Sequence, residues 1–303
     1  MTHPSTTLTE LSDALAAAVE KAGASTVLVN ARRRIPASGV IWSADGAILT
    51  SDHVIERDEE ITVVLADGRE LAATIAGRDP GSDLAVLRVK ADGLVAAERS
   101  PQGAARVGNF VLAVGRPSPE GPMASFGVIS ALGGPWRTFR GTEVEGYIRS
   151  DTTFYPGFSG GPLVDAAGRV VGINSSRLGR GAGLTIPVAA AARVADDLLN
   201  QGRVRRAYLG ISSQPARLPA ALSAKLNGQE SGLLIVQVEP ASPAEAAGLG
   251  IGDILVGFGG APVTDTDSLQ AALGAKKVGD PVAVAILRGG EPRDLTVTLG
   301  ERN

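Results

Sequence analysis

The chain contains no cysteine and only two histidines in 303 residues. Without cysteine, disulfides, thiol nucleophiles and thiolate metal sites are excluded. Two histidines cannot form an imidazole-rich metal site, and no spaced cluster of carboxylates is evident, so we expect no metal and no cofactor. His3 lies in a terminal segment that is prone to fraying. This leaves His53 as the one imidazole available for chemistry.

The chain also has little excess of either charge and no long apolar run. A net charge of −3 gives little attraction for nucleic acids or anionic membranes, and we interpret the single basic run, 32–34, as a solvated loop. No run reaches the roughly eighteen apolar residues of a membrane span. Residues 1–13 do not resemble an export signal, so we expect a cytoplasmic protein if Met1 is the native start. A periplasmic or extracellular location would require a truncated chain.

Aromatic residues are also few, at 4% of the chain, whereas glycine and proline are frequent, with 39 and 18 residues. This composition favours short strands and tight turns. About a dozen β-type runs between residues 26 and 186, without helices between them, are typical of antiparallel barrels or of a sandwich. Apolar residues at helical spacing predict an amphipathic helix over about 8–22. After a linker at 204–207, mixed strands and short helices predict a compact α+β module.

The stretch Pro156-Gly157-Phe158-Ser159-Gly160-Gly161-Pro162 places a serine between glycines, where the backbone can bend sharply. A serine hydroxyl becomes a useful nucleophile only when a neighbouring base takes its proton. The stretch also fits the G-x-S-x-G pattern of α/β-hydrolases, which would suggest an esterase. In that fold the histidine follows the serine, but no histidine follows Ser159. The order histidine, aspartate, serine favours a double-barrel serine protease instead.

Six aspartates lie between His53 and Ser159, and each is a candidate for the residue that would orient the imidazole. Asp83 leads directly into the apolar run 84–87, so we expect it to be partly buried, as that role requires. A capping or turn role for Asp83 is the alternative. The other candidates lie next to turn residues, in a charged surface run, or close to the serine: Asp58, Asp67, Asp79, Asp92 and Asp151.

Three motifs, at 50–54, 81–87 and 156–163, together resemble the HtrA/Deg family of trypsin-like serine proteases with one C-terminal PDZ domain. The resemblance covers nearly the whole chain. It implies a mostly β protein: a double antiparallel β-barrel with an N-terminal helix over residues 1–203, and a small α+β PDZ domain over residues 208–303.

The resemblance implies a role for each matching residue. Ser159 would be the nucleophile, His53 the general base and then acid, and Asp83 the residue that orients His53. The backbone N–H groups of Gly157 and Ser159 would form the oxyanion hole. The S1 pocket would have Thr153 at its base and Phe154, Ser175 and Ser176 in its wall. Without a carboxylate at the base, and with a phenylalanine narrowing the pocket, we expect small aliphatic P1 residues.

The C-terminal module shows two hallmarks of a bacterial PDZ domain. Tyr208-Leu209-Gly210-Ile211 matches the carboxylate-binding loop, and the stretches 242–249 and 252–255 match the second hallmark. The glycine exposes backbone N–H groups for a peptide carboxylate, and the following strand can pair with the peptide.

The family resemblance implies a serine endopeptidase that cleaves unfolded or damaged proteins. Its PDZ domain would bind C-terminal or extended peptides, either to recruit substrate or to regulate activity. A homo-trimer assembled through the N-terminal part is expected on the same ground. The alternative is a weak or inactive protease that acts as a peptide-binding chaperone or adaptor. The presence of His53, Asp83 and Ser159 argues against it.

Phe158 departs from the family, in which asparagine is usual before the nucleophile. Its bulk either biases the oxyanion loop toward a closed conformation or simply packs. We therefore hypothesise a loop that is ordered by substrate or by occupancy of the PDZ domain.

Overall fold

The computed structural model describes residues 4–137, 143–179 and 183–301, so Met1 and His3 lie outside it. The chain separates into two compact units, Met1–Val204 and Arg205–Asn303. Ala207, which we placed in the linker, already begins a strand of the second unit. In the described ranges, no helix has both the length and the apolar character that crossing a bilayer requires.

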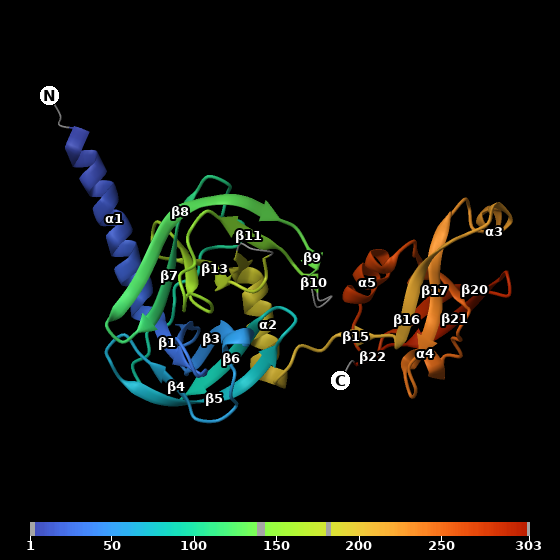
Figure 1. Ribbon diagram of the computed structural model, residues 1–303, viewed down its shortest axis with the longest axis horizontal. Helices are drawn as coiled ribbons and strands as arrows, with labels where there is room; N and C mark the ends of the chain where they lie inside the picture. The colour runs from blue at the N-terminus through green and yellow to red at the C-terminus, as the bar shows by residue number, and fades with distance from the viewer. Residues whose placement is uncertain (1–3, 138–142, 180–182, 302–303) are drawn as a thin grey trace. The chain divides into compact units, whose positions relative to one another are not determined.

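A closed antiparallel barrel forms the first half of unit 1 (Figure 1). Its strands follow the order β1-β2-β3-β6-β5-β4 around the barrel. Short runs rich in valine, isoleucine and leucine form these strands because branched side chains pack well on a pleated surface. Their bounds are β1 (Thr26–Asn30), β2 (Ala37–Ile41), β3 (Ala47–Ser51), β4 (Ile61–Val64), β5 (Glu70–Asp79) and β6 (Leu84–Val89).

A second closed antiparallel barrel has the order β11-β14-β13-β12-β7-β8. The two barrels confirm the double barrel expected from the sequence and exclude a sandwich. The strands are β7 (Phe110–Ser118), β8 (Gly121–Gly133), β11 (Tyr147–Ser150), β12 (Pro162–Asp165), β13 (Val170–Ser175) and β14 (Leu184–Pro187), and the separate pair β9 (Trp136–Arg137) and β10 (Glu143–Val144) extends from them.

Two helices flank the barrels. α1 (Pro4–Ser25) is longer than the expected 8–22, and it buries Ala18 and Ala22 in the core that both barrels share. α2 (Val188–Gln201) follows Pro187 and ends at Gly202, which adopts a left-handed conformation with φ 72°. Glycine tolerates this conformation without strain, so it stops the helix cleanly.

Unit 2 contains a six-stranded antiparallel sheet and short helices. Five strands follow the order β16-β17-β18-β20-β21, and the sixth, β19, pairs with β18. Among the described strands, β16 pairs only with β17 and is therefore an edge strand. The elements are β15 (Ala207–Tyr208), β16 (Ile211–Arg217), α3 (Ala220–Lys225), β17 (Ser231–Val238), α4 (Pro243–Ala246), β18 (Ile254–Phe258), β19 (Ala261–Pro262), α5 (Thr266–Gly274), β20 (Pro281–Arg288), β21 (Glu291–Thr298) and β22 (Gly300–Glu301).

Candidate active site

Ser159 lies in a tight loop of the second barrel, just before β12, where the first barrel approaches closely. Gly157 has φ 92°, and a side chain there would place its Cβ 2.8 Å from the carbonyl oxygen of Pro36. Gly160 has φ 83°, and a Cβ there would come within 2.2 Å of the carbonyl oxygen of Ser38. Both positions therefore require glycine, for conformation and for space.

Ser38, on β2 of the first barrel, fixes this loop. Its backbone N–H donates to the Ser159 carbonyl at 3.1 Å, and its hydroxyl donates to the Gly157 carbonyl at 2.7 Å. The same hydroxyl accepts a hydrogen bond of 2.8 Å from the Arg116 N–H. Ser38 was not predicted from the sequence, because no local motif marks a residue that acts across two barrels.

The backbone N–H groups of Gly157 and Ser159 remain available. Neither donates a hydrogen bond to an acceptor in the described part of the chain, whereas both carbonyls are engaged by Ser38. Two unengaged N–H groups beside a serine hydroxyl meet the chemical requirement for stabilising a negatively charged oxygen.

The Phe158 side chain packs in the core of the second barrel. Its side chain is fully buried, with 0% exposed. It packs edge-on against Tyr155 with ring centroids 5.4 Å apart, and it fills the space above Gly115, where an added Cβ would lie 2.6 Å from the ring. Of the two expectations for Phe158, packing describes its position in the structure.

His53 and Asp83 both come from the first barrel. His53 lies in the single-turn 3₁₀ helix η1 (Asp52–Val54) after β3, and Asp83 immediately precedes β6. Because β3 and β6 are paired with Ser51 opposite Leu84, the two residues are neighbours. The Asp83 carboxylate accepts from the His53 Nδ1 at 2.8 Å and from the His53 backbone N–H at 3.0 Å. Asp83 is buried, and the His53 side chain is 14% exposed.

Asp83 has φ 59°, a left-handed conformation that aspartate tolerates better than most residues. Its carboxylate also accepts the hydroxyl of Ser175. We expected Ser175 in the wall of the S1 pocket. Its side chain is instead fully buried and contacts the carboxylate, so the hydroxyl helps to fix Asp83.

The other aspartates are engaged elsewhere. Asp79 accepts from the N–H groups of Gly81 and Ser82 and stabilises the turn before Asp83. Asp58 pairs with Arg78, and Asp151 accepts from the backbone of β8. The Asp83 carboxylate, by contrast, bonds to both the Nδ1 and the backbone N–H of His53.

Arg78, on the neighbouring strand β5, holds the turn that carries His53. The Nε of Arg78 donates to the buried Asp52 carboxylate at 2.7 Å, and its Nη2 donates to the carbonyls of Asp52 and Ile55 at 3.2 and 3.0 Å. Both ends of η1 are thus tied to β5. Neither Asp52 nor Arg78 was predicted as a supporting residue, although Asp52 directly precedes His53.

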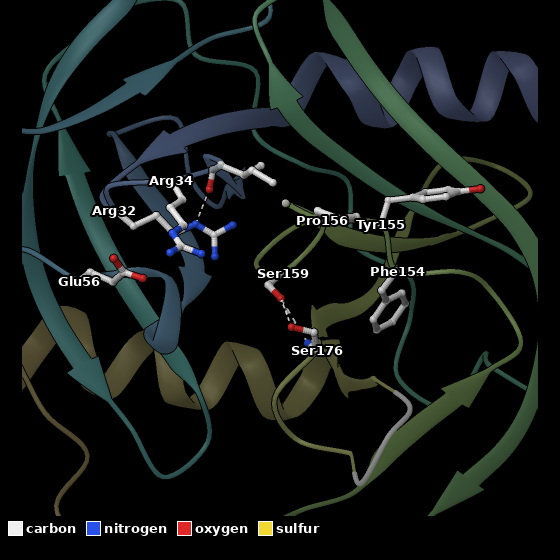
Figure 2. Close-up of a pocket in the computed structure, with 10 residues that line it drawn as sticks. Arg32, Arg34, Glu56, Phe154, Tyr155, Pro156, Ser159 and Ser176 are labelled. Atoms are coloured by element: carbon white, nitrogen blue, oxygen red, sulfur yellow. Dashed lines mark hydrogen bonds between the residues drawn. The ribbon is translucent and has the colours of Figure 1, made fainter.

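In the described part of the chain, the Ser159 hydroxyl does not form a hydrogen bond with His53. Among the described residues, the Ser159 hydroxyl bonds instead to the Ser176 hydroxyl at 2.9 Å and accepts from the Ser176 N–H at 3.2 Å (Figure 2). A serine hydroxyl changes partner by rotation about one side-chain bond, and hydrogen bonds between nucleophile and base are often loose before substrate binds.

A pocket of about 370 Å³ opens beside Ser159. Figure 2 shows Phe154 and Tyr155 on one side of Ser159, and Arg32, Arg34 and Glu56 on the other. The Phe154 ring lies over Gly183, where an added Cβ would be 2.2 Å from the ring. Thr153, which we expected at the base of the pocket, is exposed and does not line it. Its carbonyl accepts a hydrogen bond of 2.7 Å from the Ser125 hydroxyl.

In unit 2, Gly210 adopts φ 90° immediately before the edge strand β16. Its carbonyl accepts from the Glu239 N–H at 2.9 Å, whereas its own N–H donates to no described residue. Leu209 is buried and Tyr208 bonds to Glu239, so the flanking side chains anchor the loop. The loop from Tyr208 to Ile211 thus presents an N–H group beside an unpaired strand edge.

Known proteins resemble this chain in both units. Residues 37–173 match the trypsin-like peptidase domain family and residues 207–299 match the PDZ domain family. A "Probable periplasmic serine endoprotease DegP-like" of Halomonas elongata is 38% identical over 89% of this chain and 57% of its own length. A protein with the same description from Marinomonas sp. is 37% identical over 88% of this chain and 57% of its own length. The chain thus spans little more than half the length of these relatives.

Solved structures agree over almost the full chain. The HtrA-type protease AlgW with a decapeptide has a TM-score of 0.79 and 29% identity, covering 95% of this chain and 99% of that one. The serine endoprotease from Yersinia pestis has a TM-score of 0.77 and 32% identity, covering 94% of this chain and 97% of that one.

These relatives also correct one expectation. We expected a cytoplasmic protein, but relatives that match most of the chain are described as periplasmic. The chain has two closed barrels followed by a PDZ module, and the matches to known proteins extend over both units. These findings together identify one protein family. The chain belongs to the HtrA family of trypsin-like serine proteases that carry a PDZ domain.

Proposed function

We propose that this chain is a serine endopeptidase that cleaves unfolded or damaged proteins with His53, Asp83 and Ser159. The observation that carries the proposal is the buried Asp83 carboxylate, which holds the Nδ1 side of His53 at 2.8 Å. With its proton fixed on Nδ1, the imidazole leaves Nε2 free to accept the proton of a nucleophile.

The reaction would begin when the Ser159 hydroxyl exchanges its bond with Ser176 for one with His53. As the Ser159 oxygen attacks the substrate carbonyl, its proton passes to His53 Nε2. The N–H groups of Gly157 and Ser159 would then bind the negatively charged oxygen of the tetrahedral intermediate. His53 then gives the proton to the leaving amine. Water next attacks the acyl group while His53 takes a proton from it, and the bond to Ser159 breaks as His53 passes that proton to the serine oxygen.

We propose that small aliphatic P1 residues are preferred. Phe154 supports this proposal because its ring occupies the space above Gly183 and narrows the pocket beside Ser159. Hydrolysis of matched peptides with alanine, valine or arginine at P1 tests it. Efficient cleavage of the arginine peptide alone would contradict the proposal.

We propose that the PDZ domain binds C-terminal or extended peptide segments and thereby recruits substrate or regulates cleavage. An added peptide strand would pair with the free edge of β16, and its carboxylate would meet the loop at Gly210. The solved relative AlgW holds a decapeptide. Fluorescence anisotropy with a labelled peptide, repeated with Gly210→Val, would measure this binding.

We further propose a periplasmic location, as described for the relatives, and a homo-trimer. Leu8 and Leu11 on α1 are 70% and 40% exposed, which supports a contact between subunits through the N-terminal part. Analytical ultracentrifugation of the wild type and of a Leu8→Ser, Leu11→Ser double variant tests the trimer.

Digestion of casein by the wild type and by Ser159→Ala tests the proposed activity. We expect cleavage by the wild type only. Running both with candidate C-terminal peptides asks whether the PDZ domain regulates cleavage. If wild type and Ser159→Ala bind peptides equally and neither cleaves casein, the chain acts as an adaptor and the proposal fails.

A further inference from the structure

The basic run 32–34 has a place in the active-site pocket. Arg32 and Arg34 line the pocket, whereas Arg33, between them, is exposed and does not. Among the described residues, the charged side chains that line the pocket are these two arginines and Glu56, and together they carry a formal charge of +1. Ile35, Phe154, Tyr155 and Pro156 supply apolar surface beside these charges.

Arg32 is held in place by its own loop. Its Nε donates to the Ile35 carbonyl, and its Nη2 donates to the Pro36 carbonyl at 3.3 Å. A guanidinium has five N–H donors, and these bonds use two of them. Burial lowers the pKa of Arg32, and the nearby Glu56 opposes that shift. Arg34 is exposed, and no hydrogen bond or ion pair joins it to another described residue.

The position of these groups indicates which part of a substrate they would meet. In the proposed mechanism His53 gives its proton to the leaving amine, so the residues after the scissile bond must pass over the barrel that carries His53. The loop with Arg32 and Arg34 follows β1 of that barrel, and Glu56 follows η1. The P1 side chain would lie on the opposite side, against Phe154 of the second barrel.

We propose that Arg32 and Arg34 form a subsite for a carboxylate in the first three substrate residues after the scissile bond. The inference rests on the proposed protease function and adds a selectivity for acidic segments to it. An aspartate or glutamate side chain supplies such a carboxylate, and so does a free C-terminus. Glu56 limits the effect by offsetting part of the positive charge.

Quenched fluorescent peptides with a constant sequence before the scissile bond test the subsite. Aspartate, asparagine, alanine or lysine is placed at each of the next three positions, with the C-terminus amidated. We expect kcat/KM to be highest for aspartate and lowest for lysine at one or more positions, by about two- to fivefold per arginine, as for partly exposed ion pairs. The preference should shrink at 0.5 M salt because of screening. A parallel set with a free C-terminus distinguishes the terminal carboxylate from the side chain.

Matched variants of the basic run locate the effect. Arg34→Gln should reduce the ratio of aspartate to lysine cleavage, and Glu56→Gln should increase it. Arg33→Gln removes the same charge from a residue outside the pocket and should leave the ratio unchanged. Arg32→Gln should act like Arg34→Gln, and the rate of fluorophosphonate labelling reports whether the Ser159 loop of each variant is intact.

Two results would overturn the subsite. One is equal cleavage of the aspartate, asparagine and lysine peptides at all three positions. The other is an effect of Arg33→Gln as large as that of Arg34→Gln, which would indicate general surface charge. A wild-type chain that neither reacts with fluorophosphonate nor cleaves any peptide would instead overturn the proposed function, and the subsite with it.

Discussion

Replacing Asp83 by asparagine changes the hydrogen bonding of His53 while keeping the side-chain size. The carboxylate accepts from the His53 backbone N–H, from its Nδ1 and from the Ser175 hydroxyl. An asparagine would keep its oxygen on the backbone N–H, because two N–H donors cannot face each other favourably. Its NH₂ group would then face Nδ1 and Ser175. The Ser175 hydroxyl can rotate to accept, but Nδ1 can accept only if the imidazole proton moves to Nε2.

An imidazole protonated on Nε2 cannot take the proton of Ser159. We therefore expect kcat to fall about 10⁴-fold for Asp83→Asn, which corresponds to about 5.4 kcal/mol of lost transition-state stabilisation. Peptide hydrolysis measures the loss, and thermal unfolding checks that the fold is intact. Asp92→Asn removes one charge from an exposed aspartate and should change kcat less than twofold, by roughly 0.4 kcal/mol at most. A kcat within tenfold of the wild type for Asp83→Asn would refute the assigned role.

Three further changes test other parts of the structure. Phe158→Ala should lower the free energy of unfolding by about 3–5 kcal/mol, measured by urea denaturation, because a fully buried ring is lost; a loss below 1 kcal/mol would contradict the packing argument. Arg78→Gln removes the donors that hold Asp52 and should lower kcat about tenfold with little change in KM, and Arg78→Lys should restore part of it. In the PDZ domain, burial raises the pKa of Asp253, but hydrogen bonds from Arg288 and the Gly250 N–H outweigh it and hold the pKa below its usual value. That stabilisation is complete above about pH 4 and is lost as the pH falls through the lowered pKa. The protection factors of the PDZ amides in the full chain, which correct hydrogen exchange for its own dependence on pH, should therefore fall in acid, and Asp253→Asn should remove this fall.

Local sequence was sufficient for features that depend on neighbouring residues. The apolar run after Asp83 correctly indicated a buried aspartate at the start of a strand. Gly157 and Gly160, beside Ser159, predicted a sharp bend, and the structure gives both glycines a positive φ. The short strands and turns likewise predicted antiparallel barrels or a sandwich, because alternation and turn chemistry are local properties, and the order of the catalytic residues and the family resemblance selected the double barrel.

Features that depend on how distant segments meet were not predictable in this way. The direction of the Ser175 hydroxyl is set by the register of β13 against β14 and by the approach of the other barrel. The backbone of Thr153 is joined to Ser125 on β8, a residue 28 positions away, and no local pattern indicated this bond. Ser38 acts across the two barrels, and nothing in its local sequence distinguishes it from other serines in strands.

We propose that Ser159, activated by His53, is the nucleophile of a protease. The most direct test is to react the full chain with a fluorophosphonate and locate the modified residue by mass spectrometry. The neighbouring hydroxyls of Ser175 and Ser176 serve as internal controls, because both lie within the same site. We predict modification of Ser159 alone, lost in Ser159→Ala and strongly slowed in His53→Ala. Modification of Ser176 instead, or no modification of the wild type with or without a PDZ-binding peptide, would contradict the account.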